Sequence, residues 1–267
     1  VFGEGLKPLR YGENPHQKAN LKVHANSPLD WNQPLTATEL SYNNIVDLSS
    51  AYYVARDLKS AFPDRTSVVI VKHNNPCGVA SVPKNAPKAQ LRALEKAWAC
   101  DPVSAFGGVL IFTDEIDAEI LGYFDNRFVE LLSAPKLQAG NLGDLLKHRK
   151  NLKAVTVKHW DLESPSMQMS VAGGVLTQTL DLQLQEPIRG VTEAAWPTEF
   201  NDLAHFGIFC NKTLKSNSVC LVQKDQDGDF RMVGAGQGQP NRVEAMGKLA
   251  IPRAQNILGR EDLGDCI

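Results

Sequence analysis

Lys72 and His73 are adjacent residues whose side chains suit proton transfer, and they follow the apolar run 67–71. Histidine titrates near neutral pH, and a partly buried lysine can donate or accept a proton, so the pair could serve as base and acid. Consecutive strand residues point to opposite faces, so the two side chains converge only if the backbone leaves strand geometry. The Asn-Asn-Pro sequence at 74–76 favours such a departure. A solvated lysine and a histidine hydrogen-bonded in a turn fit the same residues equally well.

Arg10 and Tyr11 form a candidate phosphate site near the start of the chain. A forked guanidinium beside a neutral hydroxyl donor matches the oxygens of a phosphate group. Gly12 and the Asn-Pro pair at 14–15 predict a turn that presents both side chains. Taken alone, the segment fits a solvated surface arm better than a binding site.

Two further segments could recognise a flat, polar ligand. Phe106 could stack on a heterocycle while Gly107 lets the backbone approach it, although a core phenylalanine is the simpler interpretation. Asn217 can both donate to and accept from a carboxamide or formyl group. Asn241 and Arg242, at the start of an expected helix, could bind an anion through backbone N–H groups and the guanidinium. The alternative is that Asn241 caps this helix and that Arg242 is solvated.

The chain lacks the residue patterns of the common metal and dinucleotide sites. His73 and Cys77 suggest a zinc deaminase, but Asn75 and Ala80 occupy the positions of the required glutamate and second cysteine. Gln239 interrupts the glycine pattern of a dinucleotide site. We therefore predict a site without a metal.

Alternating helical and strand patterns must position these residues. The periodicity predicts helices over 47–62, 87–100, 198–213 and 242–258, and strands over 67–71, 108–112, 170–176, 218–223 and 230–233. A hairpin turn is expected at 225–228 and a glycine-rich loop at 234–241. Strands and helices that alternate at these lengths indicate an α/β layered fold.

Length and composition restrict the class of protein. The 267 residues are 43% hydrophobic with a net charge of −2, which excludes a disordered chain and a basic surface that would gather nucleic acid. No apolar run is long enough to cross a membrane. The five scattered cysteines favour a reduced, cytoplasmic location. We predict no nucleic-acid or membrane partner.

Taken together, the candidate segments occur in an order that is typical of one family. The motifs are LRYGENPHQ at 9–17, VKHNNPCG at 71–78, DPVSAFGG at 101–108, KSNS at 215–218 and GAGQ with NR over 234–242. The sequence resembles the AICAR transformylase domain of the bifunctional purine-biosynthesis enzymes, from about residue 7 to residue 250.

The resemblance implies a fold and an activity. It implies two tandem cytidine-deaminase-like α/β units without the zinc site, over 1–165 and 166–267, the second lacking its C-terminal part. It implies formyl transfer from the co-substrate 10-formyltetrahydrofolate to the 5-amino group of AICAR, with no catalytic metal and no IMP cyclohydrolase activity. It also implies a homodimer with shared active sites. The alternative is a weak or inactive nucleotide-binding, regulatory homologue.

The same resemblance implies a role for each candidate residue. His73 would act as the base, Lys72 would stabilise the oxyanion or protonate the departing folate nitrogen, and Asn217 would orient the formyl or carboxamide oxygen. The expected substrate-binding residues are Arg10 and Tyr11 at the phosphate, Phe106 and Gly107 at the base, Glu130 at the folate, and Asn241 with Arg242 near Asn217.

Overall fold

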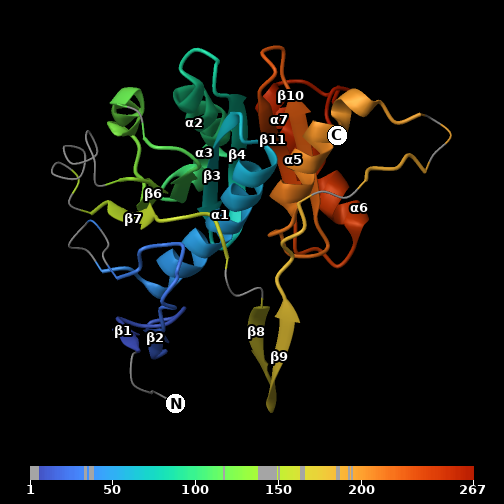
Figure 1. The fold of residues 1–267 in the computed structure, drawn as a ribbon. Helices are drawn as coiled ribbons and strands as arrows, with labels where there is room; N and C mark the ends of the chain where they lie inside the picture. Colours follow the sequence, from blue (N-terminus) through green and yellow to red (C-terminus); the bar gives the residue numbers. More distant parts are fainter. Residues whose placement is uncertain are drawn as a thin grey trace.

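Seven strands form one mixed sheet in the computed structural model, which describes residues 6–32, 35, 39–116, 118–137, 149, 151–162, 166–184, 187–191, 193 and 195–267. They are β3 (Arg65–Lys72), β4 (Asn75–Pro83), β5 (Val109–Phe112), β6 (Leu131–Pro135), β7 (Lys153–Val157), β10 (Val219–Lys224) and β11 (Phe230–Gly236). Their order across the sheet is β10-β11-β4-β3-β5-β6-β7 (Figure 1). The predicted α/β class is therefore confirmed.

The ends of several strands lie together at one edge of the sheet. Strand β3 runs antiparallel to both β4 and β5, whereas β5, β6 and β7 are mutually parallel. Val71 pairs with Val109, which in turn pairs with Leu131. The end of β3 and the starts of β5 and β6 therefore lie side by side, which places Lys72 next to the segments that precede Val109 and Leu131.

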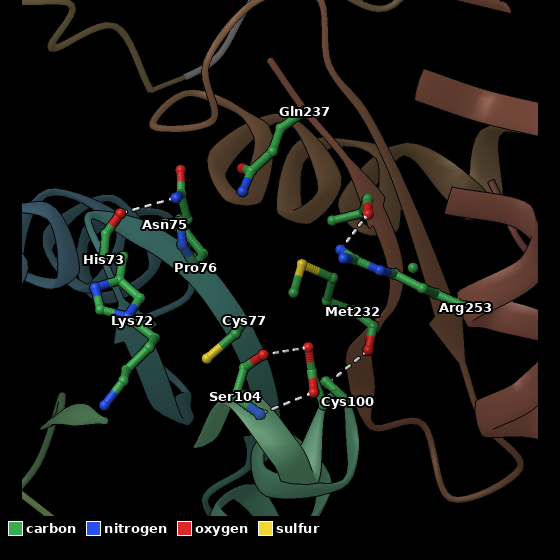
Figure 2. A pocket seen from close by; sticks show the side chains of 13 residues that line it. Lys72, His73, Asn75, Pro76, Cys77, Cys100, Ser104, Met232, Gln237 and Arg253 are labelled. Atoms are coloured by element: carbon green, nitrogen blue, oxygen red, sulfur yellow. Dashed lines mark hydrogen bonds between the residues drawn. The ribbon is translucent and has the colours of Figure 1, made fainter. Parts of the chain in front are cut away.

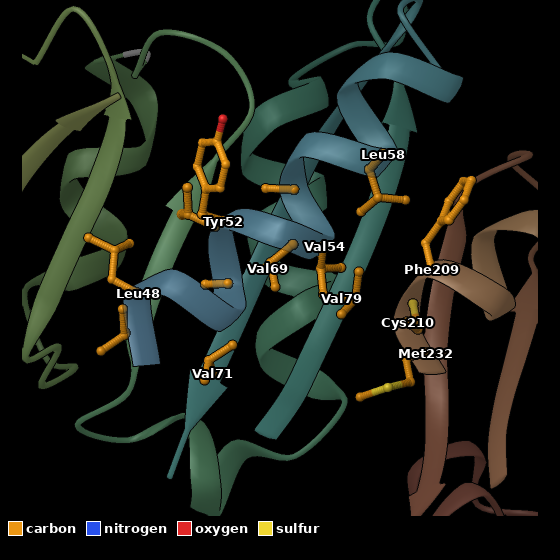
Figure 3. Close-up of a cluster of buried hydrophobic side chains, with 14 of the residues drawn as sticks. Leu48, Tyr52, Val54, Leu58, Val69, Val71, Val79, Phe209, Cys210 and Met232 are labelled. Carbon is orange, nitrogen blue, oxygen red and sulfur yellow. The ribbon is translucent and has the colours of Figure 1, made fainter. Parts of the chain in front are cut away.

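Helices cover both faces of this sheet. They are α1 (Tyr42–Ala61), α2 (Ala89–Ala99), α3 (Pro102–Ala105), α5 (Asn201–Asn211), α6 (Arg242–Glu244) and α7 (Ile251–Leu258), with 3-10 turns η1 (Ala118–Phe124) and η2 (Thr198–Phe200) and a π-helical segment η3 (Ala245–Ala250). Helices α1 and α5 pack on one face in a core that includes Val69 and Val71 (Figure 3). Helix α2 packs on the other face, against Val68 and Ile70. This alternation explains why residues 68–71 of β3 are all apolar: each face of the strand is buried there.

Helix α1 begins at a reciprocal cap. The Ser41 hydroxyl accepts the backbone N–H of Asn44, and the Asn44 side chain accepts the backbone N–H of Ser41. This arrangement satisfies donors that the first helical turn leaves unpaired, so the helix starts at Tyr42, ahead of the range 47–62 expected from periodicity.

Strand β4 was not predicted, because its first residues, Asn75 and Pro76, indicate a loop. His73 and Asn74 instead form a tight turn, with φ angles of 51° and 62°, that reverses the chain from β3 into β4. Consecutive left-handed residues are typical of two-residue hairpins because their twist matches that of the strands.

The expected strand over 170–176 is wrong. The segment spans the end of β8 (Ser166–Val171), a turn at 172–173 and the start of β9 (Gly174–Thr179), because Gly173 takes a φ of 76° and the chain reverses there. The hairpin projects away from the main sheet, as does the small pair β1 (Lys7–Leu9) and β2 (Ala19–Leu21) (Figure 1).

The glycine-rich loop expected from residue 234 begins later than predicted, because β11 continues to Gly236. A Cβ at Gly236 would lie 1.9 Å from the carbonyl oxygen of Ala245, so glycine allows η3 to pack directly on the strand. The helix predicted over 242–258 is confirmed as the run α6, η3 and α7. The π-helical segment precedes Pro252, which has no backbone N–H to donate.

Among the described residues, no helix combines the length and the apolar character needed to cross a membrane.

Candidate functional site

Lys72 and Gly107 meet at the sheet edge where β3 ends and β5 begins. The Lys72 Nζ atom donates to the carbonyl oxygen of Gly107 at 2.5 Å. Gly107 has a φ of 68°, and its backbone N–H donates to the Phe128 carbonyl oxygen at 2.7 Å. A Cβ at Gly107 would lie 3.1 Å from both Lys72 Nζ and the Phe128 ring. The position therefore requires glycine for its backbone angle and because there is little space around it.

An aromatic pair borders this lysine. The rings of Phe106 and Phe128 lie 5.6 Å apart at 53°, and 57% of Phe106 and 45% of Phe128 remain exposed. Phe106 is therefore not a core residue, and its ring is available to a flat ligand. Phe128 was missed in the sequence analysis. The available signal was an aromatic residue two positions before Glu130, just ahead of a buried strand.

Glu130 lies at the same sheet edge. Its backbone N–H donates to the Gly108 carbonyl oxygen at 3.1 Å, immediately before β6 begins. Its Oε1 atom accepts from the Asn44 side chain at 2.8 Å and lies 3.4 Å from Lys153 Nζ. The structure thus brings Lys72, Gly107 and Glu130, predicted from separate segments, to one place.

His73 lies in the turn between β3 and β4 with its side chain exposed. The turn contacts Asp47 of α1, whose carboxylate accepts the Asn74 backbone N–H at 2.6 Å. Burial raises the pKa of Asp47, and hydrogen bonds from the backbones of Asn74 and His73 partly oppose that rise. Asp47 was not among the predicted site residues, because nothing in the pattern of α1 indicates a contact with this turn.

A cavity of about 200 Å³ opens beside the catalytic candidates (Figure 2). Lys72, His73 and Cys77 line one side, and Met232, Gln237 and Arg253 line the other. The Lys72 ammonium turns out of the cavity toward Gly107. Burial raises the pKa of the Cys77 thiol well above its usual range, so this group stays protonated at neutral pH and packs as a small apolar side chain.

Asn217 is held against the loop that follows β11. Its Nδ2 atom donates to the carbonyl oxygens of Gln239, at 3.1 Å, and Pro240, at 3.0 Å. Both amide donors are therefore used, and the Oδ1 atom is the group left to meet a ligand. Asn241 caps α6 through the Glu244 backbone N–H at 2.8 Å. The Asn241 side chain therefore takes the capping role, which is the alternative to anion binding.

Arg242 is exposed beside that cap, and Arg10 is exposed on the turn between β1 and β2. The Arg10 guanidinium lies 5.6 Å from the centre of the Tyr11 ring, so the two predicted phosphate ligands are neighbours. Within the described residues, the cavity beside Lys72 and His73 is lined by none of Arg10, Tyr11 and Arg242.

Comparison with known proteins shows the family of this chain. The model of the family described as "AICARFT/IMPCHase bienzyme" matches residues 2–253. The chain belongs to this family. Among curated relatives, the bifunctional purine biosynthesis protein PurH of Persephonella marina is 35% identical over 260 residues, covering 93% of this chain and 46% of that protein. PurH of Prochlorococcus marinus AS9601 is 37% identical over 265 residues, covering 94% of this chain and 48% of that protein.

This member of the AICARFT/IMPCHase family spans about half the length of the curated relatives it matches. Among solved structures, RibD of Acinetobacter baumannii, form 1, is 21% identical with a TM-score of 0.30, covering 43% of this chain and 34% of that chain. A TM-score this low does not establish a shared fold. The family match, in contrast, covers every segment of the sheet-edge cluster, including Lys72, Gly107 and Glu130.

Proposed function

We propose that this chain transfers a formyl group from 10-formyltetrahydrofolate to the 5-amino group of AICAR, a step of purine biosynthesis. The observation that carries the proposal is the contact of Lys72 with Gly107, at one sheet edge with Glu130 and the exposed Phe106–Phe128 pair. AICAR and the folate are charged and contain flat rings. A cation, a carboxylate and exposed aromatic rings are groups that can bind them. The match to the AICARFT/IMPCHase family supports the same activity.

The chemistry requires acid–base groups and an oxyanion donor. The amine of AICAR is a weak nucleophile because its imidazole ring withdraws electrons. Its nitrogen attacks the formyl carbon, a C–N bond forms, and the carbonyl oxygen becomes an oxyanion. His73 accepts the proton that the amine loses. The tetrahedral intermediate then collapses, the bond to the folate nitrogen breaks, and that nitrogen takes a proton from Lys72. The proton held by His73 passes back to Lys72 through solvent, so both side chains return to their starting protonation states.

Lys72 can donate a hydrogen bond to the oxyanion without leaving its present position. An ammonium group carries three N–H donors, so one can remain on the Gly107 carbonyl oxygen while another reaches the substrate. The Gly107 contact thereby fixes the direction of the side chain before substrate arrives. Preorganised donors of this kind stabilise developing charge without reorganisation during the reaction.

We assign substrate binding to the remaining candidates. Arg10 and Tyr11 would bind the nucleotide phosphate, Phe106 and Gly107 would contact the imidazole, and Glu130 would meet the folate. Asn217 would accept an N–H from the AICAR carboxamide or amine through Oδ1, because its own amide donors are already used. This revises the predicted role, in which Asn217 met an oxygen. Asn241 would shape the adjoining loop, and Arg242 would supply a cation there.

We also propose the finer architecture and the setting. The first cytidine-deaminase-like unit, 1–165, would consist of β3 to β7 with α1 and α2, and the second, 166–267, would contribute β10 and β11; residues 163–165 at this boundary lie outside the described residues.

The protein would act in the cytoplasm as a homodimer that shares its active sites. The exposed apolar side chains of the β8–β9 hairpin support the dimer, because an isolated two-stranded hairpin is only marginally stable. No metal takes part in the proposed steps, and IMP cyclohydrolase activity is not assigned to this chain.

The test is the release of tetrahydrofolate by the intact protein with AICAR and 10-formyltetrahydrofolate. The proposal predicts release that requires both substrates and yields formylated AICAR in equal amount. AICAR binding without any turnover would contradict it and would favour a binding or regulatory homologue.

A further inference from the structure

One face of α1 carries three polar side chains toward the candidate site. Asn44, Asp47 and Ser50 are spaced three residues apart, so they lie on one side of the helix. Only 2% of Asn44 and 9% of Asp47 is exposed. Buried polar groups of this kind require hydrogen-bond partners. We call these residues the α1 polar face.

All three residues bind segments that carry candidate site residues. Asp47 Oδ1 accepts the backbone N–H of Asn74 at 2.6 Å, in the turn that also carries His73. The Ser50 hydroxyl lies 2.5 Å from Asn74 Oδ1 and donates to it. Asn44 donates to Glu130 at 2.8 Å. The α1 polar face therefore joins the His73–Asn74 turn to the acidic side of the same site.

The turn has a physical need for this support. His73 and Asn74 both have positive φ angles, a conformation that is unfavourable for most L-residues. A buried carboxylate is itself costly unless it is hydrogen-bonded. The hydrogen bond between Asp47 and the turn offsets both costs. The Asn74 N–H satisfies the buried Asp47 carboxylate, and the carboxylate stabilises the turn.

We propose that Asp47 is a positioning residue for the formyl transfer. It fixes the His73–Asn74 turn and thereby sets His73 relative to Lys72, which is held separately by Gly107. Asp47 contacts no substrate in this scheme. The inference rests on the proposed function, and it adds to it the element that holds the base in place.

The test measures formyl transfer in the intact protein with Asp47→Ala, Asp47→Asn and a matched control. Asp47→Ala should lower kcat by about 10- to 100-fold, because misplacing a reacting group by about an ångström has effects of that order. The KM for AICAR should change less than about twofold, since the phosphate ligands lie on another segment. Asp47→Asn should recover part of kcat, because its Oδ1 atom can still accept the Asn74 backbone N–H.

Asp57→Asn is the control, because Asp57 is a buried acid of the same helix bound instead to Lys212, at 2.7 Å. It should lower thermal stability while leaving kcat per folded molecule near that of the wild type. A purely structural role for Asp47 predicts the same pattern for Asp47→Ala, and that result would overturn the proposal.

Amide hydrogen exchange at Asn74 gives a readout that does not depend on turnover. Exchange should be slow in the wild type, faster in Asp47→Ala and unchanged in Asp57→Asn. Equal exchange in wild type and Asp47→Ala would overturn the proposal even if kcat fell. A wild-type protein without formyl transfer would refute the proposed function instead, and the exchange rates would still decide whether Asp47 holds the turn.

Discussion

At the scale of single residues, Gly107 connects the backbone of the site to its chemistry. Its carbonyl oxygen binds Lys72, its N–H binds Phe128, and its φ of 68° lies in the region that favours glycine. The side chain that a substitution would add points at Lys72 Nζ, 3.1 Å away. Stability and catalysis are therefore coupled at this position.

We predict that Gly107→Ala lowers both the free energy of unfolding and kcat. The left-handed backbone alone should cost about 1 kcal/mol, and crowding of Lys72 and Phe128 should add to that cost. Displacement of Lys72 should lower kcat about tenfold or more. Urea unfolding and steady-state kinetics measure the two effects.

The matched control is Gly228→Ala, because Gly228 has a φ of 79° but no heavy atom within 4 Å of an added Cβ. It should show the backbone cost without the loss of kcat. Equal kcat values for Gly107→Ala and the wild type would show that the position of Lys72 does not depend on this glycine.

The sequence supported the prediction of some site residues and not of others. Lys72 and His73 were identified because they are adjacent and follow a buried strand. Asp47 was not, because it lies 27 residues from Asn74 and meets it only when α1 packs on the sheet. Phe128 was missed for the same reason, since its contact with Gly107 depends on β5 and β6 lying side by side.

At the scale of elements, Asp114 ties the end of β5 to its neighbours. Its carboxylate lies 2.6 Å from Lys59, near the end of α1, and 3.1 Å from Lys84, just after β4. Burial by itself would raise the pKa of Asp114, but the two ammonium groups outweigh it and hold the pKa below its usual range. The ionised carboxylate therefore stabilises the folded state.

This shift predicts a defined pH dependence. Because the pKa is lower in the folded state, the contribution of Asp114 is complete above the unfolded pKa, about pH 4, and is lost as the pH falls through the folded value. Asp114→Asn should reduce the free energy of unfolding at neutral pH by up to about 1 kcal/mol. The difference from wild type should shrink steadily below about pH 4. Urea unfolding at a series of pH values measures it.

The exposed Asp64 provides the comparison, since Asp64→Asn should leave that pH dependence unchanged. A difference between Asp114→Asn and wild type that persists undiminished at the lowest pH would show that the ion pairs are not its source.

Elements with one dominant period were predictable, and those defined by a turn were not. Strand β3 and helices α1 and α2 follow directly from burial on one or two faces. The β8–β9 hairpin was read as one strand because its turn, at Gly173, is flanked by apolar residues on both sides. Strand β4 was missed because the His73–Asn74 turn that begins it has no glycine.

At the scale of the whole molecule, the β8–β9 hairpin indicates how two copies could associate. Every residue of both strands is exposed, including Met169 at 55% and Val175 at 61%. Apolar side chains gathered on a projecting hairpin favour burial against a partner. The proposed homodimer would bury them.

We predict that Met169→Glu shifts the intact protein from dimer toward monomer, because a charge would then be buried in the proposed interface. Val191→Glu serves as the control, since Val191 is 92% exposed outside the hairpin. Sedimentation velocity measures both. A wild-type protein that is monomeric and active would contradict the shared-site dimer.

The central claim is that the sheet edge around Lys72 and Gly107 performs the formyl transfer, and the most direct measurement is the kcat of Lys72→Met. Methionine retains most of the side-chain length and removes the ammonium group, so the fold and AICAR binding should persist. Loss of one oxyanion donor predicts a fall in kcat of about 100-fold or more. A folded Lys72→Met protein with wild-type kcat would contradict the account.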